Sequence, residues 1–220
     1  MPKSSVAVIC LFISLLVGPV VPSVAAEANY RFTEDWVTPN TGNWRQQLRH
    51  LEGRPNIHAL EIGSFEGRSA LWFLGNILTH ATSTMTCVDV FADPAYEARF
   101  DHNIQVSTFA KKVRKMKGLS QKVLRQLKPH SYDLIYIDGS HMAVDVLIDA
   151  VLSWDLLKPG GIIIFDDYAM GSNVAPQVPS FQRTNPWSRP QIAVDAFLDV
   201  FKPYIDLRHK GYQVIVRKRN

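Results

Sequence analysis

Short apolar runs rich in β-branched residues alternate with longer segments of helical hydrophobic spacing from about residue 43 to the C-terminus. This alternation is typical of a parallel sheet with helices packed on both faces. The chain of 220 residues is long enough for one sizeable core. We therefore predict a single α/β domain over residues 27–220, built on a doubly wound, Rossmann-like sheet.

The order of the predicted elements follows from the spacing of apolar positions and from the Gly and Pro residues between them. We expect strands at 57–62, 85–91, 113–117, 134–138 and 162–165. We expect helices at 44–51 and 68–78, a helix opened by Asp93-Pro94, a helix after residue 141 and a final helix around 194–201. Two last apolar runs, 205–208 and 213–216, flank Lys210-Gly211 and predict a C-terminal antiparallel hairpin.

Two of these segments carry more specific expectations. In the helix after residue 141, the stripe Val144, Leu147, Ile148 and Val151 has helical spacing and is expected to face the core. The stretch 168–190 contains four prolines and no periodicity. A loop of this length in a compact domain is typical of a lid or a substrate-binding element, and disorder is the alternative.

The first 26 residues differ from the rest of the chain. Lys3 precedes an apolar run over residues 6–21, and small residues follow at Ser23 and Ala25 or at Val24 and Ala26. This pattern predicts a secretory signal removed near Glu27, which places the protein in the secretory pathway, outside the cell or in a periplasm. A membrane anchor over residues 6–21 is the alternative, since about 16 apolar residues are marginal for a span that needs roughly 20.

Charge and cysteine content narrow the classes of function. The formal net charge is +4, and the basic clusters at 111–117 and 217–219 lack interleaved aromatic residues, so we expect solvated faces and no nucleic-acid partner. The two cysteines are Cys10, inside the predicted signal, and Cys87, inside a strand. The mature chain would then hold one thiol and no internal disulfide, and we expect Cys87 to be a buried small hydrophobe.

Acidic residues end four of the predicted strands. Ligands of doubly wound sheets bind at the carboxyl ends of the strands, so these acids are the first candidates for a site. Glu61 begins a glycine turn over residues 61–69 that lacks the dinucleotide pattern G-x-G-x-x-G. A leading acid favours a ligand with a cationic amino group, which points to S-adenosylmethionine. Asp89, at the next strand end, is placed to accept hydrogen bonds from a ribose diol, and a helix cap is the bland alternative.

The other strand-end acids suggest metal chemistry. Asp138, Asp166 and Asp167 end neighbouring strands, and three carboxylates in one cleft require a cation. Oxygen ligands suit a hard divalent ion, Mg²⁺ by default. His141 follows Asp138 by three residues and is a candidate general base, although a lone histidine is as often a cap or a surface residue.

These residues resemble a known family. The span from Glu61 to the C-terminus looks like the class I methyltransferases, in particular the macrocin-type and related sugar O-methyltransferases and the cephalosporin-hydroxylase-like proteins. The resemblance rests on Ile137-Asp138-Gly139-Ser140-His141, on residues 156–161 running into Phe165-Asp166-Asp167-Tyr168, and on residues 193–198. The chain is also similar to the catechol and caffeoyl-CoA O-methyltransferases, which have a lysine base where His141 stands and an asparagine where Asp167 stands.

The resemblance implies a fold, a methyl donor and a set of site residues. It implies a donor site for S-adenosylmethionine and a divalent metal at Asp138, Asp166 and Asp167. Near the adenine it implies Ser120, where an acid often found in the family is missing. The residues expected to contact the donor are Glu61, Gly63, Ser64, Gly67, Ser69, Asp89, Ser120 and Asp138.

The predicted function is therefore O-methylation of a hydroxyl on a small molecule or sugar, with metal assistance and with His141 and Asp138 as catalytic residues. We expect Mg²⁺ to lower the pKa of the acceptor hydroxyl and His141 to remove its proton. Two alternatives remain: a binding protein that keeps the fold without the chemistry, and a hydroxylase-like or hydrolytic metal enzyme on the same scaffold. A membrane contact is expected only through the N-terminal segment.

Overall fold

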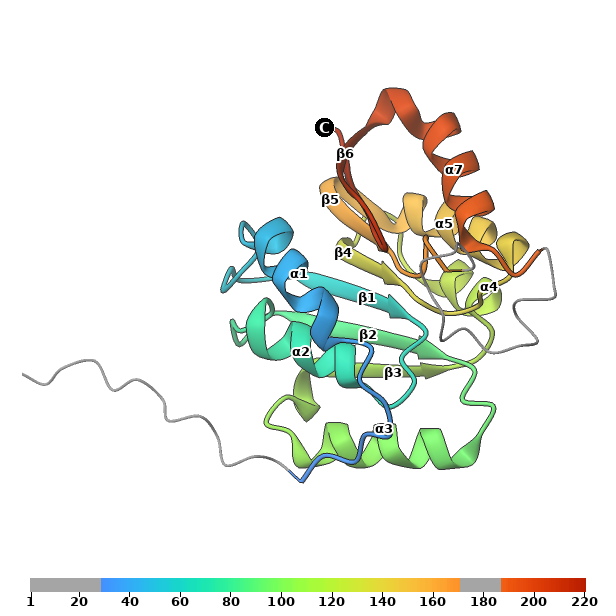
Figure 1. Cartoon of the computed structure of the whole chain (residues 1–220). Coiled ribbons are helices and arrows are strands. Elements are labelled where there is room, and N and C mark those ends of the chain that lie inside the picture. Colours follow the sequence, from blue (N-terminus) through green and yellow to red (C-terminus); the bar gives the residue numbers. More distant parts are fainter. Residues whose placement is uncertain (1–28, 171–186) are drawn as a thin grey trace, which may run out of the picture.

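The computed structural model describes residues 29–170 and 187–220 (Figure 1). The predicted signal and most of the predicted loop, residues 171–186, lie outside the described residues. The strands are β1 (His58–Ile62), β2 (Thr84–Asp89), β3 (Val113–Lys117), β4 (Tyr132–Ile137), β5 (Leu157–Phe165), β6 (Ile205–Lys210) and β7 (Val214–Lys218). The α-helices are α1 (Thr41–Leu48), α2 (Arg68–Asn76), α3 (Pro94–Val106), α4 (Ser120–Val123), α5 (Ala143–Leu156) and α7 (Pro190–Phe201).

The strands form one seven-stranded sheet in the order β3-β2-β1-β4-β5-β7-β6. The strands from β1 to β5 are parallel, whereas β7 pairs antiparallel with both β5 and β6. This arrangement confirms the predicted doubly wound sheet and the C-terminal hairpin. Because β1 pairs with both β2 and β4, the ends of these three strands open onto one edge of the sheet.

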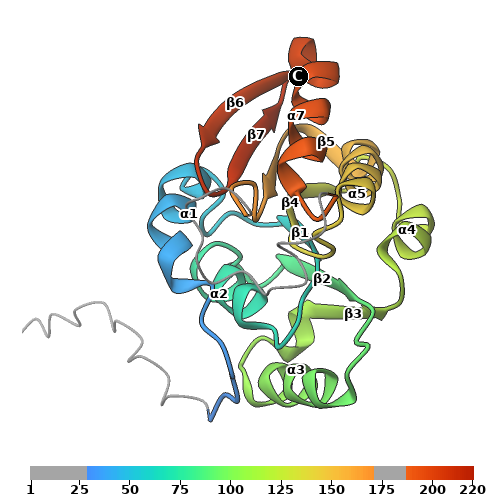
Figure 2. The same cartoon turned by 45° about the vertical axis from the view of Figure 1, so that its right-hand side comes forward.

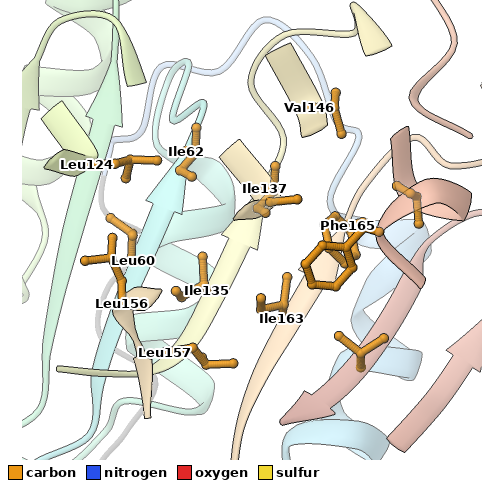
Figure 3. Close-up of a cluster of buried hydrophobic side chains, with 14 of the residues drawn as sticks. Leu60, Ile62, Leu124, Ile135, Ile137, Val146, Leu156, Leu157, Ile163 and Phe165 are labelled. Carbon is orange, nitrogen blue, oxygen red and sulfur yellow. The ribbon is translucent and has the colours of Figure 1, made fainter. Parts of the chain in front are cut away.

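Helices cover both faces of the sheet (Figures 1 and 2). Along the central strands alternate side chains enter two separate cores, as the pleat requires. One core packs Leu60, Ile135 and Ile163 against α4, α5 and α7, and Figure 3 shows these side chains beside one another on the same face of the sheet. The other core packs Ala59, Leu134 and their neighbours against α1, α2 and α3.

Several local predictions hold and one is wrong. Asp93 caps α3 by accepting a hydrogen bond from the backbone N–H of Ala95, and Cys87 is fully buried. The stripe on α5 is wrong: Val144, Leu147 and Val151 are exposed, with 63%, 36% and 48% of their surface accessible. The helix instead buries Ala143, Val146, Asp149, Ala150, Ser153 and Leu156. Small side chains on that face allow the helix to lie close to the sheet.

Strand β5 also begins earlier than expected. The predicted strand at 162–165 is only the end of β5, because residues 158–161 also lie within the strand, where the pairing with β4 shifts register. Within the described ranges, the helices are all too short or too polar to cross a membrane.

Candidate functional site

Gly63 sets the close approach of two strand ends. It follows β1 with a φ of +87°, and a Cβ at this position would lie 2.0 Å from the carbonyl oxygen of Asp138. The backbone N–H of Asp138 donates to the carbonyl of Ile62 at 2.8 Å, which ties the end of β4 to the end of β1. Glycine is required here because only glycine combines this φ with this contact. The predicted donor turn and the predicted metal cluster are therefore adjacent.

Glu61 is a buried acid with one unsatisfied oxygen. Its Oε1 accepts a 2.6 Å hydrogen bond from Ser69 Oγ in the first turn of α2. Its Oε2 is buried and has no hydrogen-bond partner among the described residues, and the same holds for Ser64 Oγ. Burial raises the pKa of Glu61 to about 7, although the Ser69 hydroxyl opposes that shift. Buried acceptors without partners are costly, so this carboxylate fits a site completed by a ligand that donates hydrogen bonds.

Asp89 organises the glycine turn. Its Oδ2 accepts hydrogen bonds from the backbone N–H groups of Ser64 and Phe65, both at 2.9 Å, and its Oδ1 accepts one from Phe91 at 2.7 Å. The carboxylate therefore holds the turn in place through two bonds and ties it to the segment after β2 through the third. An ionised carboxylate has about four acceptor positions, so the three bonds leave room for about one more donor. Ribose binding by Asp89 stays a prediction. Gly67, with a φ of +81°, closes the turn at the N-terminus of α2.

The N-terminal segment is tied to this turn through a second buried acid. Glu66 is 1% exposed and accepts hydrogen bonds from the backbone N–H and the hydroxyl of Thr33, at 2.7 and 2.8 Å, and it forms an ion pair with Arg99 on α3. Asn103, fully buried on α3, bonds the backbone of Arg31 and the carbonyl of Glu66. We call residues 30–37 the N-terminal strap, which passes α3 and α2 before it reaches α1 (Figure 2).

Asp138 and Asp166 meet at a tyrosine. The hydroxyl of Tyr136 lies within hydrogen-bond distance of Asp166 Oδ2 and 3.0 Å from Asp138 Oδ2. Burial, together with the charges of Asp166 and Asp167, raises the pKa of Asp138 well above its usual range. Burial also raises the pKa of Asp166 to about 6, with the neighbouring charge of Asp167 acting in the same direction. The cluster therefore carries less negative charge at neutral pH than three free carboxylates would.

Asp167 faces a different set of partners. Its backbone adopts a φ of +56°, the left-handed region, so it turns away from Asp166. Tyr212 in the hairpin turn donates to Asp167 Oδ1 at 2.6 Å, and His141 Nε2 lies 2.9 Å from Asp167 Oδ2. Asp138, His141 and Asp167 each offer one ligand atom, and all three atoms lie within 4.8 Å of one another. This spacing fits a divalent ion with bonds of about 2.0–2.2 Å.

Ser120 lies at the first turn of α4, beside the carboxyl end of β3. The nearby side chains are polar: Gln121 donates to Asp145 Oδ1 at 2.9 Å, and Ser140 donates to Asp145 Oδ2 at 2.8 Å. Asp149 on α5 is 2% exposed, and burial raises its pKa to about 6 while the Ser120 hydroxyl opposes that shift. The adenine role predicted for Ser120 stays a prediction.

Comparisons with known proteins place this geometry in a family. A family model described as "Methyltransferase domain" matches residues 60–168, the part of the chain that carries the glycine turn and the acids at all four strand ends. The chain contains a class I methyltransferase domain. Its sheet order, with the antiparallel β7 between β5 and β6, agrees with that assignment.

The methyltransferase domain has relatives among curated proteins. A "Putative O-methyltransferase" of Mycobacterium avium is 31% identical over 141 residues, covering 61% of this chain and 58% of the relative. One of the same name from a Mycobacterium species, strain JLS, is 30% identical over 135 residues, with the same coverage. The chain thus spans less than two thirds of the length of these relatives.

Solved structures share the fold. An O-methyltransferase from Bacillus cereus in complex with SAH is 20% identical, with a TM-score of 0.64 over 86% of this chain and 84% of the other. The O-methyltransferase TomG from Streptomyces achromogenes, in complex with SAM, is 16% identical, with a TM-score of 0.64 over 84% of this chain and 82% of the other.

Three side chains that contact the acid cluster were not predicted from the sequence. Tyr136, Tyr212 and Gln213 all bond the strand-end aspartates. In the sequence, Tyr136 looks like an ordinary core aromatic residue of an apolar strand. Its position two residues before Asp138 is the one feature that indicates that both side chains lie on the same face of the strand. The other two lie in the hairpin turn, whose register the sequence does not determine.

Proposed function

We propose that this protein transfers a methyl group from S-adenosylmethionine to the oxygen of a hydroxyl on a small molecule, with the assistance of a divalent ion. The observation that carries the proposal is the buried and unsatisfied Oε2 of Glu61 at the glycine turn. The fold, the family match and the names of the relatives support the same reaction class.

On the donor side, the chain presents one acid and one turn to the ligand. Glu61 would accept hydrogen bonds from a cationic amino group, which would keep the carboxylate ionised despite its burial. Gly63, Ser64 and Gly67 would let the backbone approach the ligand closely, and the N-terminus of α2 adds free N–H groups. Asp89 would hold the turn and, in this proposal, would also bond the ribose diol.

On the acceptor side, the strand-end cluster would hold the hydroxyl near the donor. Methyl transfer breaks the methyl–sulfur bond, forms the methyl–oxygen bond and releases the hydroxyl proton, so positioning supplies much of the rate. An ion bound by the cluster supplies a Lewis acid that lowers the pKa of the hydroxyl. Asp138 belongs both to the predicted ligand set and to the group of Asp138, His141 and Asp167 whose ligand atoms lie close together. His141 lies at the cluster, where an imidazole can act either as the proton acceptor or as a ligand.

A direct test is incubation of the purified protein with labelled S-adenosylmethionine and a panel of sugars, phenols and catechols, followed by identification of the labelled product. Sugar acceptors would agree with the macrocin-type resemblance. Calorimetry with S-adenosylmethionine gives a second measure, and Glu61→Gln is expected to weaken binding at least tenfold because the ammonium loses its ionic acceptor. Full activity in EDTA would refute the metal, and absence of any heat of binding would refute the methyl donor.

We also propose that residues 1–26 direct export, on the pattern of their sequence. S-adenosylmethionine is made in the cytosol, so an exported enzyme would require donor in its own compartment. Mass spectrometry of the mature N-terminus tests cleavage near Glu27. An intact N-terminus in a membrane fraction would instead support an anchor over residues 6–21.

A further inference from the structure

The acids of the cluster do not hold equivalent positions. Asp166 is 9% exposed, and three donors already occupy its carboxylate: the hydroxyl of Tyr136 and Gln213 Nε2 at Oδ2, and the backbone N–H of Asp167 at Oδ1. Asp138 and Asp167 are more accessible, and each has one oxygen that lies within 4.8 Å of the other's oxygen and of a ring nitrogen of His141. Both oxygens of Asp166 are therefore bonded within the protein, whereas Asp138 accepts from Tyr136 at Oδ2 and Asp167 accepts from Tyr212 at Oδ1.

Gln213 and Trp44 together fix the orientation of Asp166: Gln213 bonds Asp166, and Trp44 bonds Gln213. Trp44 on α1 is fully buried, and its Nε1–H donates to Gln213 Oε1 at 2.8 Å. An indole N–H can only donate, so the carbonyl of the Gln213 amide must face Trp44 and its NH₂ must face Asp166. The 2.9 Å bond from Gln213 Nε2 to Asp166 Oδ2 is thus set by chemistry and not by a choice of amide rotamer. Asp166 is held in the role of an acceptor within the protein.

Asp167 differs from Asp166 in that only one of its oxygens is bonded to a neighbouring tyrosine, while the other faces His141. Tyr212 occupies Asp167 Oδ1, which leaves Oδ2 to face His141 Nε2 at 2.9 Å. The extended run of β5 ends before Asp167, whose backbone is left-handed, and at this position its carboxylate meets both Tyr212 and His141. The side chain of His141 is 27% exposed and that of Asp167 is 14% exposed, so an ion in solution can reach both.

We propose that the metal ligands of this site are Asp138, His141 and Asp167, that Asp166 is a positioning residue, and that the site takes a divalent transition ion in preference to Mg²⁺. The proposal rests on the metal assistance in the proposed function and changes its ligand set and its metal. Imidazole nitrogen suits Fe²⁺, Co²⁺, Ni²⁺ and Zn²⁺, whereas Mg²⁺ prefers oxygen ligands and keeps much of its water. With its imidazole bound as a ligand, His141 would not remove the proton, and the acceptor hydroxyl would lose its proton to water.

The experiment measures metal binding directly, without turnover. Metal-free protein is titrated with Co²⁺, followed by its visible absorption, and in competition with Mg²⁺. We expect the unaltered protein to prefer Co²⁺ by about 100-fold or more. His141→Ala should remove most of that preference, because only oxygen ligands remain. Asp166→Asn should weaken both ions by about 10–100-fold, as loss of a supporting residue does, and should keep their ratio.

Controls separate a ligand from a general effect. His80→Asn replaces an exposed histidine away from the cluster and should change neither affinity. Asp138→Asn should abolish binding of both ions. Pulsed electron paramagnetic resonance of bound Mn²⁺ should detect a nitrogen nucleus in the unaltered protein and in Asp166→Asn, but not in His141→Ala. Because the nitrogen signal of the unaltered protein is a sufficient test by itself, the result does not depend on a variant that folds poorly.

Two results would overturn the proposal: a preference that survives in His141→Ala but is lost in Asp166→Asn, or bound Mn²⁺ without nitrogen coupling. Failure of the proposed function would look different. Metal binding would behave as expected, but the protein would show no heat of binding with S-adenosylmethionine and no labelled product.

Discussion

Gly63→Ala is the substitution for which the structure gives the most definite magnitude. The new Cβ would lie 2.0 Å from the carbonyl oxygen of Asp138, whereas ordinary contact begins at 3.4 Å. The ends of β1 and β4 would have to separate by about 1.4 Å, which strains the 2.8 Å bond from Asp138 N to the Ile62 carbonyl. A left-handed backbone costs alanine about 1–2 kcal/mol and overpacking costs about 1–3 kcal/mol. We expect a loss of about 2–5 kcal/mol in the free energy of unfolding.

Urea unfolding followed by circular dichroism measures this loss, and Gly42→Ala is the matched control. Gly42 lies in α1, no atom outside its neighbours is within 4 Å of the added Cβ, and the change should be neutral or stabilising by up to about 1 kcal/mol. The folded Gly63→Ala protein should also bind Co²⁺ more weakly, because Asp138 moves with its backbone. A stability loss under 1 kcal/mol with unchanged metal affinity would contradict the close approach described for these strand ends.

Three further outcomes are expected from other parts of the structure. Glu66→Gln should lower the free energy of unfolding in urea by about 2–4 kcal/mol, because the side chain loses the charge that pairs with Arg99 and accepts two hydrogen bonds from Thr33. A loss as small as that of Asp206→Asn, which removes an exposed ion pair, would contradict this. Asp149→Asn should change the pH dependence of stability. Burial raises the pKa of Asp149 in the folded protein to about 6, so the contribution of Asp149 to stability is present below about pH 4 and is lost as the pH rises through 6. The variant should therefore be about 1–3 kcal/mol more stable than the unaltered protein at pH 7 and equally stable at pH 4. Parallel curves of stability against pH for the two proteins would refute the reasoning. Cys87 is fully buried with a raised thiol pKa, so Ellman's reagent should not react with it in the native protein and should react on unfolding; rapid native labelling would show that the strand opens.

The sequence predicts the strand ends well because local chemistry determines them. β3 has the predicted bounds, and Glu61 and Asp89 lie at the carboxyl ends of β1 and β2 as expected. The stripe on α5 could not be assigned to a face in the same way. Apolar residues occur all around that helix, and the choice depends on how closely Ala143 and Ala150 let it approach the sheet, which is a tertiary effect.

The difference between Asp166, which is bonded within the protein, and the other two aspartates of the cluster could not be predicted from the sequence either. It depends on Gln213, which reaches Asp166 only because the antiparallel pairing sets Val214 opposite Phe165. A slip of one residue would turn Gln213 to the other face of the sheet. It also depends on Trp44, which lies 169 residues from its partner in sequence. No local pattern carries information on contacts of that range.

The N-terminal strap joins the first described residues to the turn that would receive the methyl donor. Because Thr33 of the strap bonds Glu66 of the turn, we expect a ligand that orders the turn to protect residues 30–37 from proteolysis. Coupling of this kind is reciprocal, so release of the strap should weaken ligand binding by the same factor. Limited proteolysis at the N-terminus would then report on occupancy of the donor site without any knowledge of the acceptor.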